Sequence, residues 1–379
     1  MPTLGAIARA WGRIGVVGFG GPPAHIALLR ELTVERRRWL RPEQFEDGLA
    51  AANLLPGPAS TQLAIYTAWR TGGPAGALVG GLAFIVPGLV LIVALAALFL
   101  GSPPDWIRGA GAGAGAAVAA VAVDAGLLLL RPAWMRVERA PRWRFVAYVL
   151  LGAASAAALG PWLVAVLAVC GLVEVGWRRV RISGLSFTPF PVLAVVVAAS
   201  TSTLASLAWV GFKVGALSYG GGFVIIPLMQ ADAVERYGWM TDPEFLNAVA
   251  LGQVTPGPVT HTVAVVGYAA AGVPGAALAA LVAFAPSFAF VLVGARRFDR
   301  LVANRDVRAF FDGAGPAATG AILGSALPLA LALQETWQWA VLAGAAVALL
   351  VLRRGVVLTL LAAGAVGAVA VVLGAPLDV

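Results

Sequence analysis

The chain alternates long apolar runs with short polar loops, which predicts many membrane-spanning helices. Windows of about twenty nearly uncharged residues recur along it, and a helix of that length crosses a bilayer. In the first half we expect helices at 4–19, from there to about residue 36, and at 45–70, 75–100, 106–130, 145–159 and 161–177. In the second half we expect them at 205–219, 222–235, 244–270, 274–295, 308–331, 337–352 and 355–373, after an additional run at 190–204. The expected fold class is an all-α polytopic membrane protein.

The two halves repeat each other at an offset of about 200 residues. The anchors of the repeat are Phe19-Gly20-Gly21 with Tyr219-Gly220-Gly221, Pro56-Gly57-Pro58 with Pro256-Gly257-Pro258, and Gly72 and Pro74 with Gly272 and Pro274. Glycine and proline inside apolar segments predict helices broken at these points. We expect an N-terminal repeat at 1–180, a linker with a further span at 181–204 and a C-terminal repeat at 205–379. Duplicated halves with broken helices are typical of secondary transporters.

Charge predicts that the two halves have opposite orientations in the membrane. The arginine clusters fall on one side, the cytoplasmic one, if each segment broken at Pro-Gly-Pro enters and leaves on the same face as a re-entrant hairpin. The loop at 30–43 is basic, whereas its counterpart at 230–244 is acidic. We therefore expect an inverted repeat with a substrate site at mid-depth between the halves. The side of the N-terminus, and whether the first short helix of each half spans, stay open.

Composition excludes several classes of protein. Hydrophobic residues make up 60% of the chain and charged residues 12%, so a soluble globular protein is not expected. The net charge of +8 arises from arginines between apolar spans, so no nucleic acid partner is expected. The single lysine, Lys213, is followed by Val214, which excludes a Walker A motif. With one cysteine, Cys170, two histidines and no visible nucleophile and base, we expect neither an enzyme nor a metal or cofactor site.

The helix that begins after each Pro-Gly-Pro should bind an anion, because free N–H groups and the positive end of the helix dipole meet there. The polar residues that follow the two breaks are Ser60, Thr61, Gln62, Thr260 and His261. Hydroxyl and amide donors at a helix start can bind an oxyanion. The alternative is that Ser60, Thr61, Thr260 and Thr262 cap the half-helices, and the sequence leaves both interpretations open. The candidate site also includes the glycines and prolines of the breaks, namely Gly20, Gly21, Pro56, Gly57, Pro58, Gly220, Gly221, Gly222, Pro256, Gly257 and Pro258.

Ionisable residues in apolar segments are further candidates, because a charge inside the membrane is costly. Arg13 and Lys213 are repeat partners, each seven residues before the first glycine of its break, and either supply charge to the anion or extend to the interface. His25 follows the first break, where the second half has Ile225. His25 is either a packing residue or an anion donor, and Asp124 either carries a coupled proton or pairs locally. Counting at the constant offset places Thr61 opposite His261, and we expect such differences between the halves to decide ion choice and proton coupling.

These motifs resemble the chromate ion transporter family in its long two-domain form. The resemblance rests on Phe19-Gly20-Gly21-Pro22 with Ala24-His25-Ile26, on Val34-Glu35-Arg36-Arg37, on Leu55-Pro56-Gly57-Pro58-Ala59-Ser60-Thr61-Gln62, and on Gly220-Gly221-Gly222, Ile226-Pro227-Leu228 and Thr255-Pro256-Gly257-Pro258. Family second halves often carry Phe before the triple glycine and His after it, where this chain has Tyr219 and Phe223. The assignments in the second half are therefore weaker than those in the first.

The resemblance implies a multi-pass protein of the bacterial inner membrane that exports chromate and confers chromate resistance, driven by the membrane potential or the proton motive force. The alternatives are a transporter of sulfate or another oxyanion and a passive anion channel. The expected partners are chromate, with sulfate as a related ion, and the lipid bilayer. A homodimer is left open.

Overall fold

The computed structural model of the protein describes residues 2–54, 57–135, 142–158, 162–182, 202–218, 223–294 and 304–377, which form helices and loops without a strand. The helices of the first half are α1 (Leu4–Val17), α2 (Gly21–Arg30), the π-helix η1 (Glu31–Arg36), α3 (Pro42–Leu54), α4 (Ala59–Phe99), α5 (Asp105–Ala116), α6 (Val118–Met135), α7 (Arg142–Ala158) and α8 (Leu163–Ile182). Those of the second half are α9 (Thr203–Leu217), α10 (Ile225–Gln230), the π-helix η4 (Ala231–Arg236), α11 (Asp242–Val254), the 3₁₀ turn η5 (Val259–His261), α12 (Thr262–Gly294), α14 (Arg305–Leu331), α15 (Thr336–Ala346), the π-helix η7 (Val347–Val351) and α16 (Val356–Val372).

The order of elements in the first half returns in the second. Helices α1 to α3 correspond to α9 to α11, and the π-helices η1 and η4 occupy residues 31–36 and 231–236 at equal positions in the two halves. The Pro-Gly-Pro segments separate α3 from α4 and α11 from η5, as the sequence predicts. The structure differs from the prediction at 106–130, where Ala117 separates α5 from α6. The predicted run at 190–204 falls almost entirely outside the described residues.

Helices α4 and α12 are each kinked nearly four turns after the Pro-Gly-Pro segment. The chain turns at Gly72 and Gly73 in α4, where Gly73 has φ 65° and ψ −159°. The matching conformation in α12, φ 63° and ψ −154°, belongs to Gly272, and glycine adopts this region without steric cost. Gly73 and Gly272, rather than Gly72 and Gly272, are therefore equivalent, and the repeat loses one residue between Pro-Gly-Pro and the kink.

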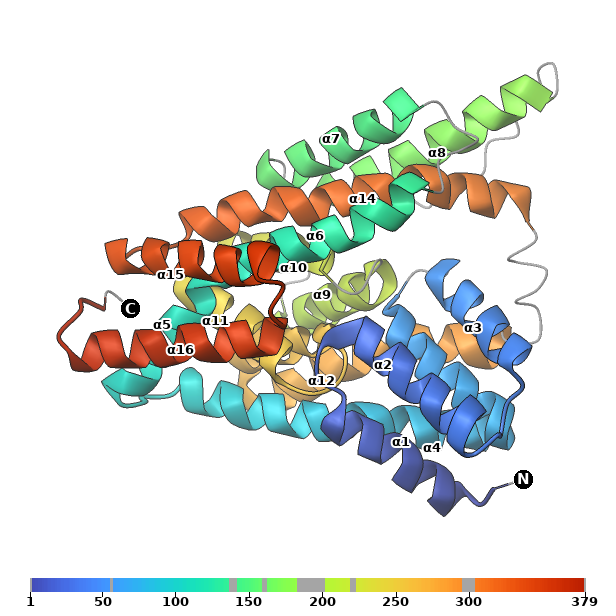
Figure 1. The fold of residues 1–379 in the computed structure, drawn as a ribbon, viewed down its shortest axis with the longest axis horizontal. Helices are drawn as coiled ribbons and strands as arrows, with labels where there is room; N and C mark the ends of the chain where they lie inside the picture. Colours follow the sequence, from blue (N-terminus) through green and yellow to red (C-terminus); the bar gives the residue numbers. More distant parts are fainter. Residues whose placement is uncertain are drawn as a thin grey trace.

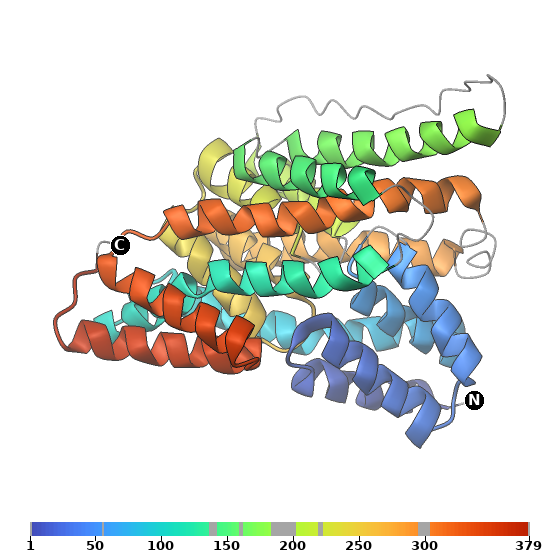
Figure 2. The ribbon, with the colours of Figure 1, turned by 45° about the horizontal axis from the view of Figure 1, so that its top comes forward.

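The two halves run in opposite directions and exchange their last helices. In Figure 1, α5 and α6 run away from the end that holds the C-terminus, whereas α14 runs back toward it. Figure 2 shows both termini in a view turned by 45°. Helices α7 and α8 of the first half pack on α14 of the second, and α16 packs on α5. Helices α4 and α12 also pack on each other. The repeats predicted at 1–180 and 205–379 are thus interlocked in space rather than separate bodies.

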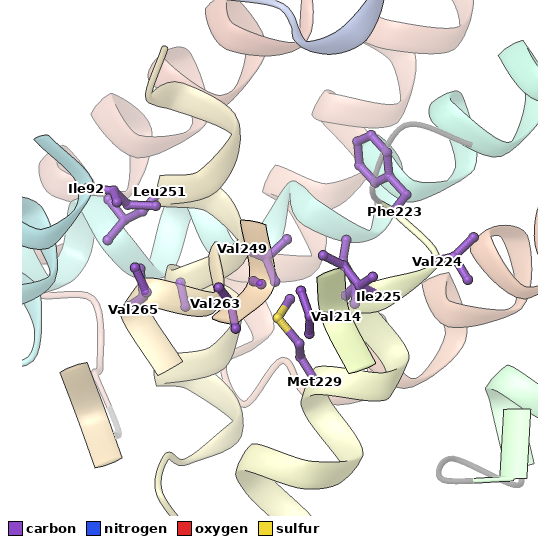
Figure 3. Close-up of a cluster of buried hydrophobic side chains, with 14 of the residues drawn as sticks. Ile92, Val214, Phe223, Val224, Ile225, Met229, Val249, Leu251, Val263 and Val265 are labelled. Atoms are coloured by element: carbon purple, nitrogen blue, oxygen red, sulfur yellow. The ribbon is translucent and has the colours of Figure 1, made fainter. Parts of the chain in front are cut away.

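Among the described residues, four helical stretches are long and apolar enough to cross a membrane by length and composition, namely Ala59–Phe99, Asp105–Met135, Val259–Gly294 and Arg305–Leu331. Small residues let these helices approach closely: a β-carbon on Gly152 of α7 or Gly320 of α14 would overlap the backbone of the other helix. Apolar side chains from α4, α9, α10, α11 and α12 meet in a buried cluster near the start of α12, including Ile92, Val214, Ile225, Met229 and Val263 (Figure 3). The half-helix that follows the second Pro-Gly-Pro is therefore surrounded by protein.

Candidate functional site

Two buried helix starts form the centre of the candidate site. Helix α4 begins after Pro58, whose carbonyl oxygen accepts hydrogen bonds from the N–H groups of Thr61 and Gln62 at 2.9 and 3.0 Å. The stretch η5–α12 begins after Pro258 in the same way, with the N–H of His261 donating to the Pro258 carbonyl at 2.9 Å. The first N–H groups of each helix have no partner within the helix, so both starts carry a positive dipole end.

The side chains at these helix starts are buried but do not cap the helices. The side chains at the two starts, those of Ser60, Thr61, Thr260 and His261, are at most 2% exposed. The N-cap residues are Pro58 and Pro258, and neither helix start has a side-chain capping hydrogen bond. The hydroxyl oxygens of Thr61 and Thr260 have no hydrogen-bond partner among the described residues. A buried hydroxyl without a partner costs free energy that a bound polar group would recover. The capping interpretation is therefore wrong for these two threonines, and the donor role stays a prediction.

A backbone hydrogen bond joins the breaks of the two halves. The N–H of Gly257 donates to the carbonyl oxygen of Gly18 at 3.0 Å, and we call this contact the Gly18–Gly257 bridge. The same carbonyl lies 2.8 Å from Nε2 of His25. Because a carbonyl oxygen only accepts, Nε2 carries the proton and Nδ1, which is buried without a partner among the described residues, has a bare lone pair. His25 is thus part of the contact between the halves.

His261 lies on the other side of the bridge. A β-carbon on Gly257 would be 2.9 Å from Cε1 of His261, and one on Gly88 of α4 would be 2.8 Å from the same atom. The rings of His25 and His261 are close enough to interact electrostatically. Each histidine ring also packs edge-on against a phenylalanine ring. The ring centroids of His25 and Phe84 are 5.1 Å apart, and those of His261 and Phe284 are 5.3 Å apart. The structure thus brings together two predicted residues from different halves.

The residue equivalent to His261 is Gln62 rather than Thr61. A β-carbon on Gly57 would meet the amide of Gln62, just as one on Gly257 would meet the ring of His261. The shortened offset after Pro-Gly-Pro also pairs Thr61 with Thr260. The pairing of Thr61 with His261 that the constant offset predicts is therefore corrected. The two helix starts share a threonine and differ at the next residue.

The predicted cations Arg13 and Lys213 have different environments despite their equal positions in the repeat. Arg13 is exposed on α1. Lys213 is 14% exposed on α9, forms an ion pair with Asp232 of η4, and lies 5.8 Å from the ring centroid of Trp209. The structure therefore pairs Lys213 with a carboxylate and does not place Arg13 beside the bridge.

Of the remaining predicted site residues, some have a described position in the structure and others lie outside the described residues. Gly20 and Gly21 have φ of 98° and 70° and open α2, so glycine is required there. Gly57 and Gly257 also have positive φ, 123° and 98°. Asp124 is half-buried on α6, where its charged neighbour is Arg353, and it is not placed at the bridge. Pro56, Gly220, Gly221 and Gly222 lie outside the described residues.

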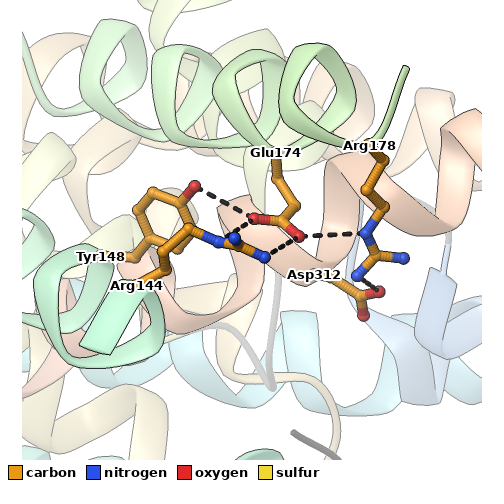
Figure 4. A network of polar contacts seen from close by, with 5 residues as sticks. All are labelled: Arg144, Tyr148, Glu174, Arg178 and Asp312. Atoms are coloured by element: carbon orange, nitrogen blue, oxygen red, sulfur yellow. Dashed lines mark hydrogen bonds and ion pairs between the residues drawn. The ribbon is translucent and has the colours of Figure 1, made fainter. Parts of the chain in front are cut away.

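Two acidic residues that sequence reasoning missed are buried and paired. Asp232 is the partner of Lys213. Glu174 of α8 accepts hydrogen bonds from Arg144 and Tyr148 of α7 and from Arg178, which in turn donates to Asp312 of α14 at 2.7 Å (Figure 4). A signal was available for both, because each lies within a predicted apolar span, where an acidic residue needs a partner.

Comparison with known proteins agrees with the motifs. The sequence profile described as chromate transporter matches residues 5–175 and 205–368. The probable chromate transport protein of Synechococcus elongatus is 31% identical over 337 residues, which are 86% of this chain and 84% of that one. The chromate transport protein of Cupriavidus metallidurans is 30% identical over 338 residues, 86% and 83% of the two chains. No solved structure matches the chain. The profile spans most of both repeats, and the chain therefore belongs to the chromate transporter family.

Proposed function

We propose that this protein transports chromate across the inner membrane of a bacterium, outward from the cytoplasm. The observation that carries the proposal is the pair of buried helix starts, whose threonine hydroxyls lack partners among the described residues, in a chain whose relatives are named chromate transport proteins. A tetrahedral dianion takes hydrogen bonds from several directions. Helix N-termini and hydroxyl groups supply such donors without a fixed cation.

The proposed binding residues come from both halves. Thr61 and Thr260 donate from their hydroxyls, and the first N–H groups after Pro58 and Pro258 donate from the backbone. His25 and His261 border the same region at the Gly18–Gly257 bridge. Glycines at 18, 57 and 257 keep side chains out of it. The anion would then bind between the halves, and exchange between inward- and outward-facing states would alter the bridge.

The membrane potential favours the export direction. With a negative cell interior, moving a dianion outward across about 100 mV releases about 4.6 kcal/mol. A transporter of sulfate would use the same site, because sulfate is also a tetrahedral dianion. An anion channel differs in showing no saturation with chromate concentration.

Chromate flux into proteoliposomes under an imposed voltage tests the proposal. We expect saturable flux that sulfate reduces by competition. Thr61→Val and Thr260→Val should each weaken chromate binding by about 10- to 150-fold, because a hydrogen bond to a charged group contributes about 1.5–3 kcal/mol. Thr67→Val is the matched control: Thr67 is buried on the same half-helix, but its hydroxyl already donates to the Leu63 carbonyl at 2.8 Å. No flux in the wild type, or equal effects of all three variants, contradicts the proposal.

The two cations provide a second test, because they are equivalent in the repeat but not in the structure. We expect Arg13→Gln to leave chromate affinity and unfolding temperature almost unchanged, since Arg13 is exposed. Lys213→Gln should lower the unfolding temperature, because it leaves the buried carboxylate of Asp232 without its cation. The double variant Lys213→Leu/Asp232→Leu should recover most of that loss. Chromate titration and thermal unfolding in detergent measure both effects. A large loss of chromate affinity in Arg13→Gln would show that Arg13 contributes to anion binding.

A further inference from the structure

The side chain of His261 is buried at the bridge, and its hydrogen bonding is limited to a loose contact with the Ile85 backbone. The residue is 0% exposed, and neither ring nitrogen makes a hydrogen bond of good geometry among the described residues. The backbone of Ile85 lies beside the ring, and Phe284 packs against it. His25, by contrast, is held by its bond to the Gly18 carbonyl. Both rings have a nitrogen that can accept a proton, and His261 is the one that lies on a helix start, next to Thr260.

A dianion beside His261 favours its protonated form. Neutral imidazole has one donor nitrogen and one acceptor nitrogen, whereas imidazolium donates from both. The acceptor lone pair of the neutral ring repels an oxyanion, and the imidazolium makes charge-assisted hydrogen bonds to it. Burial disfavours either charge alone, whereas the opposite charges attract strongly where water is excluded. Binding of the anion and binding of a proton therefore stabilise each other.

We infer that His261 takes up one proton from solution when the dianion binds between the two helix starts. This inference rests on the proposed function and adds the group that links transport to protons. The proton adds to the free lone pair of the imidazole, and no other bond forms or breaks. The bound complex then carries one negative charge less than the free dianion.

Within the part of the chain that the structure describes, one other titratable group interacts electrostatically with His261. That group is His25 of α2, and a second positive charge next to an imidazolium is disfavoured, so we expect one proton for the pair. Helix α4 faces the ring with Ile85 and Gly88, and α12 faces it with Phe284. Helix α11 carries its acidic residues, Asp242 and Glu244, in its first turn, at the end away from the break.

The helix start of the first half cannot provide the same link. The equivalent residue there is Gln62, whose amide lies against Gly57 as His261 lies against Gly257. An amide side chain does not gain or lose a proton near neutral pH. The difference between the two helix starts therefore makes proton uptake a property of the second repeat. Because the halves are related by pseudo-symmetry, exchanging the two side chains should move the proton site to the first repeat.

Calorimetric titration with chromate counts the protons directly. Measurements in buffers with different heats of ionisation, at a pH where free chromate is fully the dianion, give the number of protons taken up per anion bound. We expect up to one for the wild type, with Kd rising up to tenfold per pH unit. His261→Gln should bind chromate more weakly with no proton uptake, and Gln62→His/His261→Gln should restore the uptake.

The possible results separate this inference from the proposed function. Absence of chromate binding in the wild type overturns both. Binding without proton uptake in the wild type overturns the inference alone, and this result does not depend on whether any variant folds. Unchanged proton uptake in His261→Gln assigns the proton to another group and also overturns it.

Discussion

Gly88→Ala should abolish most chromate transport, because the added β-carbon enters the contact between α4 and the second break. That carbon would overlap the carbonyl oxygen of Pro256 and lie 2.8 and 3.0 Å from Cε1 and Nδ1 of His261. A backbone carbonyl cannot rotate away as a side chain can, so α4 and the break must separate. Overpacking of this kind costs about 1–3 kcal/mol. If that cost falls on the state that binds the anion, transport decreases by about 5- to 150-fold.

Flux measurements on reconstituted Gly88→Ala protein, together with its unfolding temperature, test this expectation. Gly344→Ala is the control, since Gly344 is exposed on α15 and a β-carbon there meets nothing within 4 Å. The control should transport at the wild-type rate. Wild-type flux in Gly88→Ala would mean that the close approach of α4 to Pro256 is not needed for transport.

The sequence was sufficient to predict the helical fold, the repeat and its breaks, because glycine and proline at fixed spacing inside apolar runs have few structural alternatives. The equal positions of η1 and η4 follow from the same repeat. The loss of one residue before the kink was not visible, because Gly72-Gly73-Pro74 and Gly272-Val273-Pro274 align plausibly in two ways. That single residue decides whether Thr61 or Gln62 is the equivalent of His261.

The candidate site was predicted in its residue types but not in its contacts. The helix starts, His25 and His261 could be named from their distance to the breaks. Their meeting at the Gly18–Gly257 bridge could not, because it depends on how the two halves interlock. The ion pair of Lys213 with Asp232 joins residues 19 positions apart across a break, and no periodicity of a single helix relates them.

Glu174 is the centre of the ion-pair network that joins α7, α8 and α14, and its removal should cause the largest loss of stability in this chain. Its carboxylate is 1% exposed and accepts from Nε and Nη2 of Arg144, at 3.1 and 3.2 Å, and from Nε of Arg178 at 3.0 Å. Arg144 is itself buried, with a side chain 6% exposed. Removing one partner of a buried pair leaves an uncompensated charge, which costs about 3–5 kcal/mol.

Glu174→Ala should therefore lower the free energy of unfolding by about 3–5 kcal/mol and markedly reduce the unfolding temperature in detergent. Arg144→Leu/Glu174→Leu should recover most of the loss, because both buried charges are removed and Arg178 keeps Asp312. Arg179→Ala is the matched control, since Arg179 joins α8 to α14 through Asp306 in a more exposed ion pair, and it should change the unfolding temperature little. Equal stability of Glu174→Ala and the double variant would show that Arg144 becomes solvated when its partner is absent. Packing, rather than the ion pair, would then hold α7 and α8 against the second half of the chain.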